Sequence, residues 1–212
     1  MDQTLFKPGE QNFARKSLGL VEAPTLLFVG RIQEFKGLDV AIEALSLSAN
    51  NDVRLVVVGG LSGNRGTETY LDIRRRIERC GLEERILFVD PQPHQLLPTY
   101  YQAADACLVP SRSESFGLVA LEAAACGLPV IASNVGGLRD NVVDGVTGLL
   151  VNERDPAEFA AAIDNLLEHQ ELRRLMGRRG VERASLNSWG LGASNAIDVF
   201  RRLISRELVS CA

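Results

Sequence analysis

The amino-acid sequence predicts an α/β fold, a doubly wound parallel sheet of about six strands flanked by helices. Short apolar runs recur along the chain, and each is followed by a loop and then by a longer segment with helical periodicity. The apolar runs lack polar alternation, which is typical of strands covered by helices on both faces. Ligands of such sheets bind outside the carboxyl ends of the strands, so we expect a site in the loops that follow the strands.

The apolar runs give the expected strands in order: 26–30, 53–59, 86–89, 106–110, 129–133 and 148–151. Apolar residues three and four positions apart predict helices between them, at 39–48, 67–80, 96–104 and 117–126. After the last strand the chain is expected to be wholly helical. Asp155 and Pro156 have the residue types of a helix N-cap and a first helical position, which begins a helix ending near His169. Further helices are expected over 171–180 and 189–208.

These elements fit one domain. The length of 212 residues agrees with a single unit, and a chain of this size folds without disulfides or a structural metal. We divide the domain 1–212 into a linker and lead-in over 1–24, a β/α core over 25–152 and C-terminal helices over 153–212.

Charge and composition exclude several classes of partner. The 23 basic and 27 acidic residues give a net charge of −4 without a long run of either sign, which disfavours nucleic acid as a partner. The sequence has no apolar run long enough to span a membrane and no signal-peptide layout, so we expect a cytoplasmic protein. Its four cysteines lack CxxC spacing, which favours a reducing compartment and argues against a metal site. They are Cys80, Cys107, Cys126 and Cys211.

Two cations, Arg31 and Lys36, stand in the loop GRIQEFKG after the first expected strand. A diphosphate would gain charge-assisted hydrogen bonds from the guanidinium and the ammonium. Two solvated surface cations are the alternative. The position at the carboxyl end of a strand favours an anion site.

Two carboxylates, Glu114 and Glu122, stand in PSRSESFGLVALEAAACGLP, the loop and helix after the fourth expected strand. Eight residues span a little over two helical turns, so both carboxylates can line one crevice. Between them, the backbone amides of the helix start can donate hydrogen bonds to phosphate or sugar oxygens. A helix-dipole carboxylate and a surface glutamate are the alternatives. Glu122 lies among small apolar residues, where a carboxylate should need a partner.

The loop VDPQPHQLLP, residues 89–98, contains three prolines. Such a rigid loop could present backbone groups to a flat base, or it is only a turn. Neither His94 nor His169 by itself indicates catalysis. The sequence has no GxxxxGK[ST] stretch and no GxGxxG after the first strand, which argues against a P-loop enzyme or a typical dinucleotide binder. It also has no Asp-x-Asp pair, which a metal-dependent sugar transfer would use to hold its cation.

The segments FVGRIQEFKG, SESFGLVALEAAACGLPVIAS and VVDGVTGLLV together resemble the C-terminal donor-binding domain of the family 4 retaining glycosyltransferases. The resemblance extends from Leu5 to about Leu208 and implies a Rossmann-like domain that forms one half of a GT-B fold. The loop FVDPQPHQLLPTYYQAAD is most similar to the branch that holds sucrose-phosphate synthases and the mycothiol-pathway glycosyltransferase. That branch uses UDP-sugars.

The resemblance implies a role for each matching position. Arg31 and Lys36 would hold the donor diphosphate and stabilise the departing UDP. Glu114 would bind hydroxyls of the hexose and Glu122 the two ribose hydroxyls, so that Glu114, Arg31 and Lys36 are the expected catalytic residues. The other expected nucleotide-sugar contacts are Gln92 and Pro93 at the uracil, and Ser115, Phe116, Gly117, Leu118 and Val119 at the phosphates and the hexose. No metal, cofactor or covalent nucleophile is expected.

In complete members of the family an N-terminal domain carries the acceptor site, and we expect that domain to be absent from residues 1–212. We therefore expect the donor half of an enzyme that transfers a hexosyl group from UDP-glucose or a related UDP-sugar to a sugar or polyol acceptor, and that is inactive without its other half. The alternative is a non-catalytic nucleotide-sugar-binding or regulatory module. A GT-B nucleotide-sugar epimerase is disfavoured, because it would want carboxylates and histidines at other loops.

Overall fold

The structure is a computed structural model that describes residues 2–61, 66–152 and 154–204. Its centre is a six-stranded sheet in the order β3-β2-β1-β4-β5-β6, and all neighbouring strands are parallel. The strands are β1 (Thr25–Val29), β2 (Arg54–Val58), β3 (Ile86–Val89), β4 (Ala106–Val109), β5 (Val130–Ser133) and β6 (Gly148–Val151). This sheet confirms the predicted fold class, and each strand lies close to its expected range.

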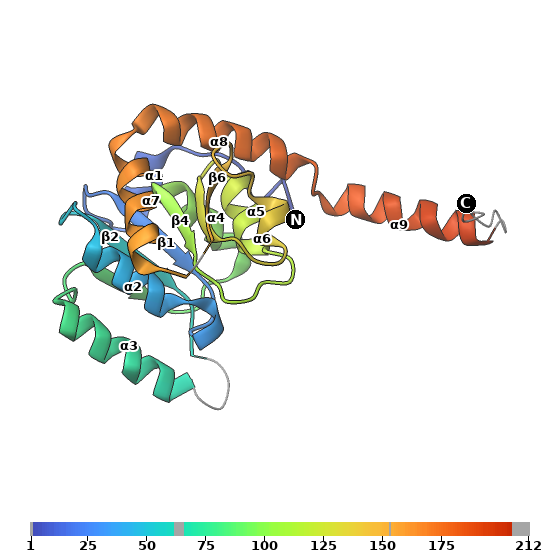
Figure 1. The fold of residues 1–212 in the computed structure, drawn as a ribbon. Helices are drawn as coiled ribbons and strands as arrows, with labels where there is room; N and C mark the ends of the chain where they lie inside the picture. The colour runs from blue at the N-terminus through green and yellow to red at the C-terminus, as the bar shows by residue number, and fades with distance from the viewer. Residues whose placement is uncertain (1, 62–65, 153, 205–212) are drawn as a thin grey trace.

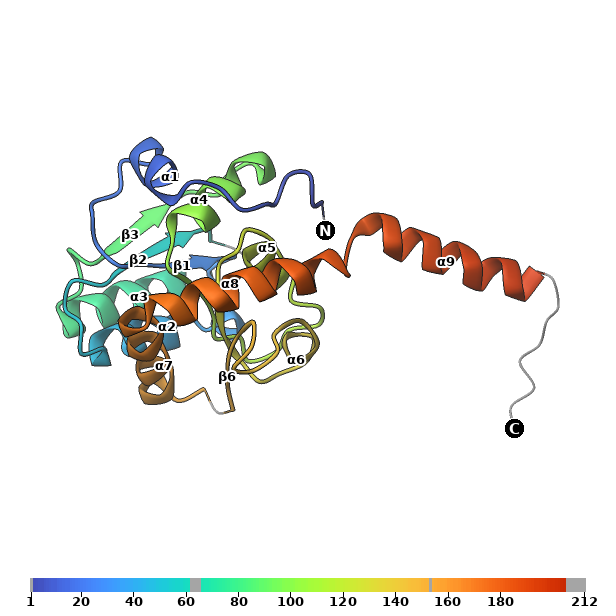
Figure 2. The same cartoon turned by 90° about the horizontal axis from the view of Figure 1, so that it is seen from above.

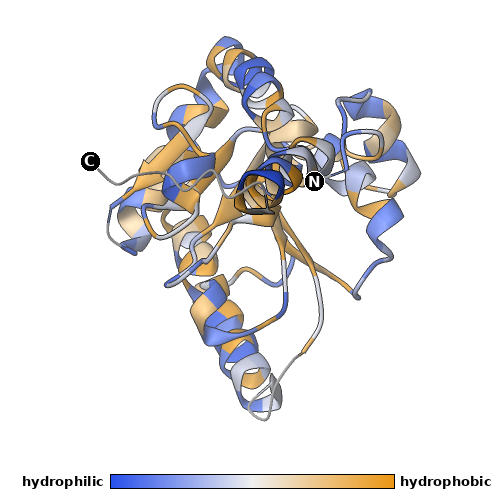
Figure 3. Cartoon of the chain, turned by 90° about the vertical axis from the view of Figure 1, so that its right-hand side faces the viewer, coloured by the Kyte–Doolittle hydropathy of each residue, from blue (hydrophilic) through white to orange (hydrophobic). Residues whose placement is uncertain are grey.

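The continuous apolar strands arise because successive side chains of a strand enter two separate cores. Leu26 and Phe28 of β1 belong to one buried cluster, whereas Leu27 between them belongs to the other. Leu55 and Val56 of β2 divide in the same way. Figure 3 shows largely hydrophobic strands at the centre and helices of mixed hydrophilic and hydrophobic residues around them.

Two layers of helices cover the sheet (Figures 1 and 2). On one face, α2 (Leu38–Leu47), α3 (Gly66–Cys80) and α7 (Pro156–Glu168) contribute to the first core. On the other face, α4 (Leu97–Ala103) and α5 (Leu118–Ala125) contribute to the second core. Helix α8 (Gln170–Ser185) joins the layers, because Met176 belongs to the first core and Ala184 to the second.

Several helices differ from the expectation. The helix expected at 96–104 is a 3₁₀ turn, η2 (His94–Leu96), followed by α4, and the helix expected at 171–180 is the longer α8. The expected lead-in contains α1 (Gln11–Ser17), and two further short elements, η1 (Glu34–Lys36) and α6 (Leu138–Asn141), were not predicted. These three are a turn or two long, too short to show an apolar period. The expected N-cap is confirmed, since the Asp155 side chain accepts a hydrogen bond from the amide of Ala157.

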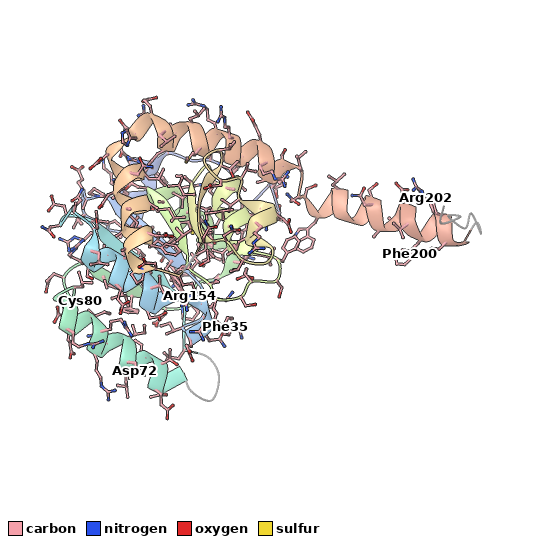
Figure 4. All side chains as sticks on the ribbon, in the orientation of Figure 1. Phe35, Asp72, Cys80, Arg154, Phe200 and Arg202 are labelled. Atoms are coloured by element: carbon pink, nitrogen blue, oxygen red, sulfur yellow. The ribbon has the colours of Figure 1, made fainter. Side chains whose placement is uncertain are left out.

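Helix α9 (Trp189–Ile204) extends away from the body of the domain (Figure 2). It carries several exposed apolar side chains, and Figure 4 shows its labelled Phe200 and Arg202 far from the sheet. The part of the 189–208 expectation beyond Ile204 lies outside the described residues. Within the described part of the chain, no helix combines the length and apolarity needed to cross a membrane.

Candidate functional site

The order of the strands reverses between β1 and β4, the two central strands. From β1 the chain proceeds outward to β2 and β3, and from β4 it proceeds to β5 and β6 on the other side. In open parallel sheets the ligand crevice lies at such a switch point, outside the carboxyl ends of the strands. The loops after β1 and β4 flank this crevice, and they are the loops that contain the predicted cations and the first predicted carboxylate.

Lys36 and Glu114 meet at the switch point. The ammonium Nζ of Lys36 lies 2.7 Å from Oε2 of Glu114, in an ion pair whose side chains are 22% and 16% exposed. The other carboxylate oxygen of Glu114 accepts a hydrogen bond of 3.4 Å from the amide of Gly117. The structure thus brings a cation, an anion and the start of a helix together from two separate loops.

A close approach of backbone holds these two loops side by side. Gly37 has a φ of 76°, and a Cβ atom there would overlap the carbonyl oxygen of Pro110. The amide of Arg112 donates to the carbonyl of Phe35 at 2.8 Å, and Nε of Arg154 donates to the carbonyl of Pro110 at 3.2 Å. Figure 4 shows Phe35 and Arg154 on the same side of the domain. The position of Lys36 relative to Glu114 is therefore fixed by backbone as well as by charge.

Helix α5 begins directly beside this ion pair. Gly117 is its N-cap, with a φ of 81°, and the first amides of any α-helix have no partner within the helix. The loop before the helix is held from the opposite side, since the carbonyl of Glu114 accepts from the amide of Gly137 at 2.9 Å. The side-chain amide of Asn141 donates to the carbonyls of Phe116 and Gly117. The helix start is thus fixed with its amides available to an anion.

Glu122 has the partners that its apolar surroundings require. The residue is 8% exposed, and its Oε2 accepts a hydrogen bond of 2.8 Å from the hydroxyl of Tyr101. Its Oε1 lies 3.2 Å from Nε2 of His94. Burial, together with the nearby Glu122 charge, raises the pKa of the Tyr101 hydroxyl well above its usual value. Tyr101 therefore stays protonated and remains a donor to the carboxylate.

The other predicted residues lie on the expected loops. Arg31 is exposed at the carboxyl end of β1, and Gln92 and Pro93 lie in the loop after β3. The remaining predicted residues, Ser115, Phe116, Leu118 and Val119, surround the start of α5, where Phe116 is 53% exposed.

The residues that support the site were missed in the sequence. No sequence motif marks Tyr101 or Asn141, and His94 by itself does not indicate catalysis. The one signal was the need of a buried carboxylate for partners, which does not say where along the chain the partners lie. Across residues 2–61, 66–152 and 154–204, no group of three His, Cys, Asp or Glu side chains could hold a metal ion.

Comparison with known proteins agrees with the resemblance to glycosyltransferases over most of the chain. Residues 10–183 match the family described as glycosyl transferases group 1. The D-inositol 3-phosphate glycosyltransferase of Corynebacterium diphtheriae is 40% identical over 98% of this chain and 50% of its own length.

Two solved structures extend the comparison. Sucrose-phosphate synthase from Thermosynechococcus elongatus superposes with a TM-score of 0.90 at 37% identity, covering 97% of this chain and 51% of its own. The Anabaena protein HepE in complex with UDP-glucose has a TM-score of 0.81 at 28% identity, covering 87% of this chain and 50% of its own. The chain thus spans about half the length of these three relatives. It belongs to the group 1 glycosyl transferases.

Proposed function

We propose that this chain is the donor-binding half of a retaining glycosyltransferase that transfers a hexosyl group from UDP-glucose or a related UDP-sugar to an acceptor hydroxyl. The observation that carries the proposal is the meeting of Lys36, Glu114 and the start of α5 at the switch point of the sheet. A cation, a carboxylate and helix amides are the groups that a sugar diphosphate needs side by side. The HepE structure, which contains UDP-glucose, supports the choice of donor.

The donor would lie across the carboxyl ends of the strands. Lys36 would give up part of its contact with Glu114 and bind the diphosphate instead. Arg31, from the same loop, would bind the diphosphate as well. This leaves the Glu114 carboxylate to accept hydrogen bonds from hexose hydroxyls. The uracil would lie by Gln92 and Pro93, and the ribose by Glu122.

The transfer step follows from this placement. The bond between the anomeric carbon and the β-phosphate oxygen breaks, and its electron pair leaves with UDP. The acceptor oxygen forms its bond to the anomeric carbon on the same face, and its proton passes to the departing phosphate oxygen. Lys36 and Arg31 stabilise the charge that develops on the diphosphate, which is the electrostatic part of the catalysis. Because these side chains supply positive charge, we propose that the step needs no metal.

The acceptor would bind in the half of the protein that the relatives have and this chain does not cover. Transfer needs both substrates to be held in one geometry, so a donor half alone lacks the positioning that makes the reaction fast. We therefore propose that the activity belongs to the longer protein and donor binding to this chain.

Saturation-transfer NMR of this chain with UDP-glucose, in the presence of EDTA, tests the proposal. We expect saturation of the uracil, ribose and glucose protons, and displacement of UDP-glucose by UDP. Equal saturation of ADP-glucose would contradict the choice of base. Loss of the signal in EDTA that returns with Mg²⁺ would contradict metal-independent binding.

A further inference from the structure

We propose that Tyr101 and His94 are positioning residues that fix the Glu122 carboxylate for a vicinal diol, so that donor binding requires both ribose hydroxyls. The inference rests on the proposed function, because it takes Glu122 as the group that meets the ribose. It goes further by assigning two residues that do not touch the ligand, and by predicting discrimination against deoxynucleotides.

The hydrogen bonds to Glu122 are divided between its two oxygens. Tyr101 occupies Oε2 at 2.8 Å, and His94 lies against Oε1 at 3.2 Å. An ionised carboxylate has about four acceptor positions, two on each oxygen. One protein donor on each oxygen therefore leaves one acceptor position on each, which matches the two hydroxyl donors of a cis-diol.

The two donors are themselves held in place. The ring of Phe6 packs edge-on against His94, at 4.9 Å between ring centroids, and against Tyr101 at 5.9 Å. Tyr101 is 1% exposed, so its hydroxyl has little freedom to turn away from Glu122. Because a carboxylate accepts hydrogen bonds, His94 donates to Glu122 in the tautomer that carries its proton on Nε2. The carboxylate is thus held at both oxygens before a ligand arrives, which lowers the ordering cost of binding.

His94 also connects two parts of the donor crevice. It directly follows Pro93, in the loop expected at the uracil, whereas Glu122 belongs to α5. The contact between them therefore joins the base loop to the helix that carries the ribose carboxylate. A nucleotide that lacks ribose hydroxyls would gain nothing from this arrangement.

The experiment is a calorimetric comparison of UDP with 2′,3′-dideoxy-UDP on the wild-type chain and on Tyr101→Phe, His94→Ala and His94→Gln. Loss of one hydrogen bond to a charged group corresponds to roughly tenfold in affinity. We expect Tyr101→Phe and His94→Ala to weaken UDP by about that factor and to leave dideoxy-UDP unchanged. His94→Gln, which keeps a side-chain donor, should recover part of the loss.

Tyr100→Phe and His169→Ala are the matched controls, since they alter the neighbouring tyrosine and an exposed histidine elsewhere. Equal losses for both nucleotides in Tyr101→Phe and His94→Ala would indicate a merely structural role and overturn the inference. The inference would also be overturned if both variants kept the wild-type ratio of the affinities for UDP and dideoxy-UDP. Equal affinities of the wild-type chain for UDP and dideoxy-UDP would show that Glu122 does not bind the ribose hydroxyls, and would also overturn the inference. Absence of UDP binding by the wild-type chain would instead overturn the proposed function, and the inference with it.

Discussion

Lys36 Nζ and Glu114 Oε2 lie 2.7 Å apart, although 78 positions separate the two residues along the chain. They come from the loops after β1 and β4, the strands between which the order of the sheet reverses. Under the proposed function, a diphosphate that enters this crevice would compete with Glu114 for the Lys36 ammonium. Binding would then exchange one anionic partner of Lys36 for another, so we expect replacements of the two residues to have opposite effects on the affinity for UDP.

Replacement of Lys36 should affect the diphosphate and spare the nucleoside. A charge-assisted hydrogen bond contributes about 1.5–3 kcal/mol, so Lys36→Ala should weaken UDP by roughly ten- to a hundredfold. Uridine, which has no phosphate, should bind as it does to the wild-type chain. Isothermal calorimetry with both ligands measures this, and the exposed Lys16→Ala on α1 is the control. Equal losses for UDP and uridine would count against a diphosphate role.

Replacement of Glu114 should have the reverse pattern. Glu114→Ala removes the carboxylate that holds Lys36, so UDP should bind as tightly as before or more tightly. The sugar contact is lost, and any preference for UDP-glucose over UDP should fall. The ratio of the two dissociation constants, measured on wild type and variant, reports this. A variant that loses UDP affinity and keeps the wild-type ratio would contradict the assignment.

Replacement of Glu122 should weaken the nucleotide and the nucleoside alike, because both contain the ribose. We expect Glu122→Ala to lower the affinities for UDP and for uridine by similar factors, unlike Lys36→Ala. The change also leaves the buried Tyr101 hydroxyl without its partner, which costs about 1–3 kcal/mol of folding stability. Thermal unfolding should be recorded beside the titrations, with the exposed Glu158→Ala as the control. Unchanged uridine affinity in a folded variant would refute the ribose contact.

Gly37 should be required for the site as well as for the backbone. Gly37→Ala places a Cβ against the carbonyl of Pro110, in a residue with a φ of 76°. Gly19→Ala is a matched control, because Gly19 has a φ of 65° and nothing within 4 Å of the added atom. The free energy of unfolding of the control should fall by about 1 kcal/mol, because alanine is strained in a left-handed backbone. In urea unfolding, the free energy of unfolding of Gly37→Ala should fall by more than that of the control, and its affinity for UDP should also fall. Equal stabilities of the two variants would contradict the close approach of the two loops.

The sequence was sufficient for the sheet, because strands buried on both faces are uninterrupted apolar runs. Leu26 and Phe28 are buried in one core and Leu27 in the other. Successive residues of one strand are buried in this way where helices cover both faces of the sheet. The missed helices α1 and α6 are short, and α1 buries only Ala14. Their positions depend on packing that a local pattern does not contain.

The site was predictable in its residue types and not in its contacts. Glu122 indicated a missing partner, but the partners, Tyr101 and His94, belong to a different loop and helix. His94 is a lone histidine in a proline-rich loop, and no local pattern there indicates its contact with Glu122. The roles of all the predicted site residues, Lys36, Glu114 and Glu122 included, stay predictions. So do the choice of a UDP-sugar, the retention of configuration, the independence from metal and the cytoplasmic location.

We expect the crevice at the switch point of the sheet to bind uridine diphosphate. Calorimetric titration of this chain with UDP, ADP and GDP in parallel, without metal, tests it most directly. We expect saturable binding of UDP that is tighter than that of ADP or GDP and that is weaker in Lys36→Ala. Tighter binding of ADP or GDP, or no saturable binding of any of the three, would contradict it.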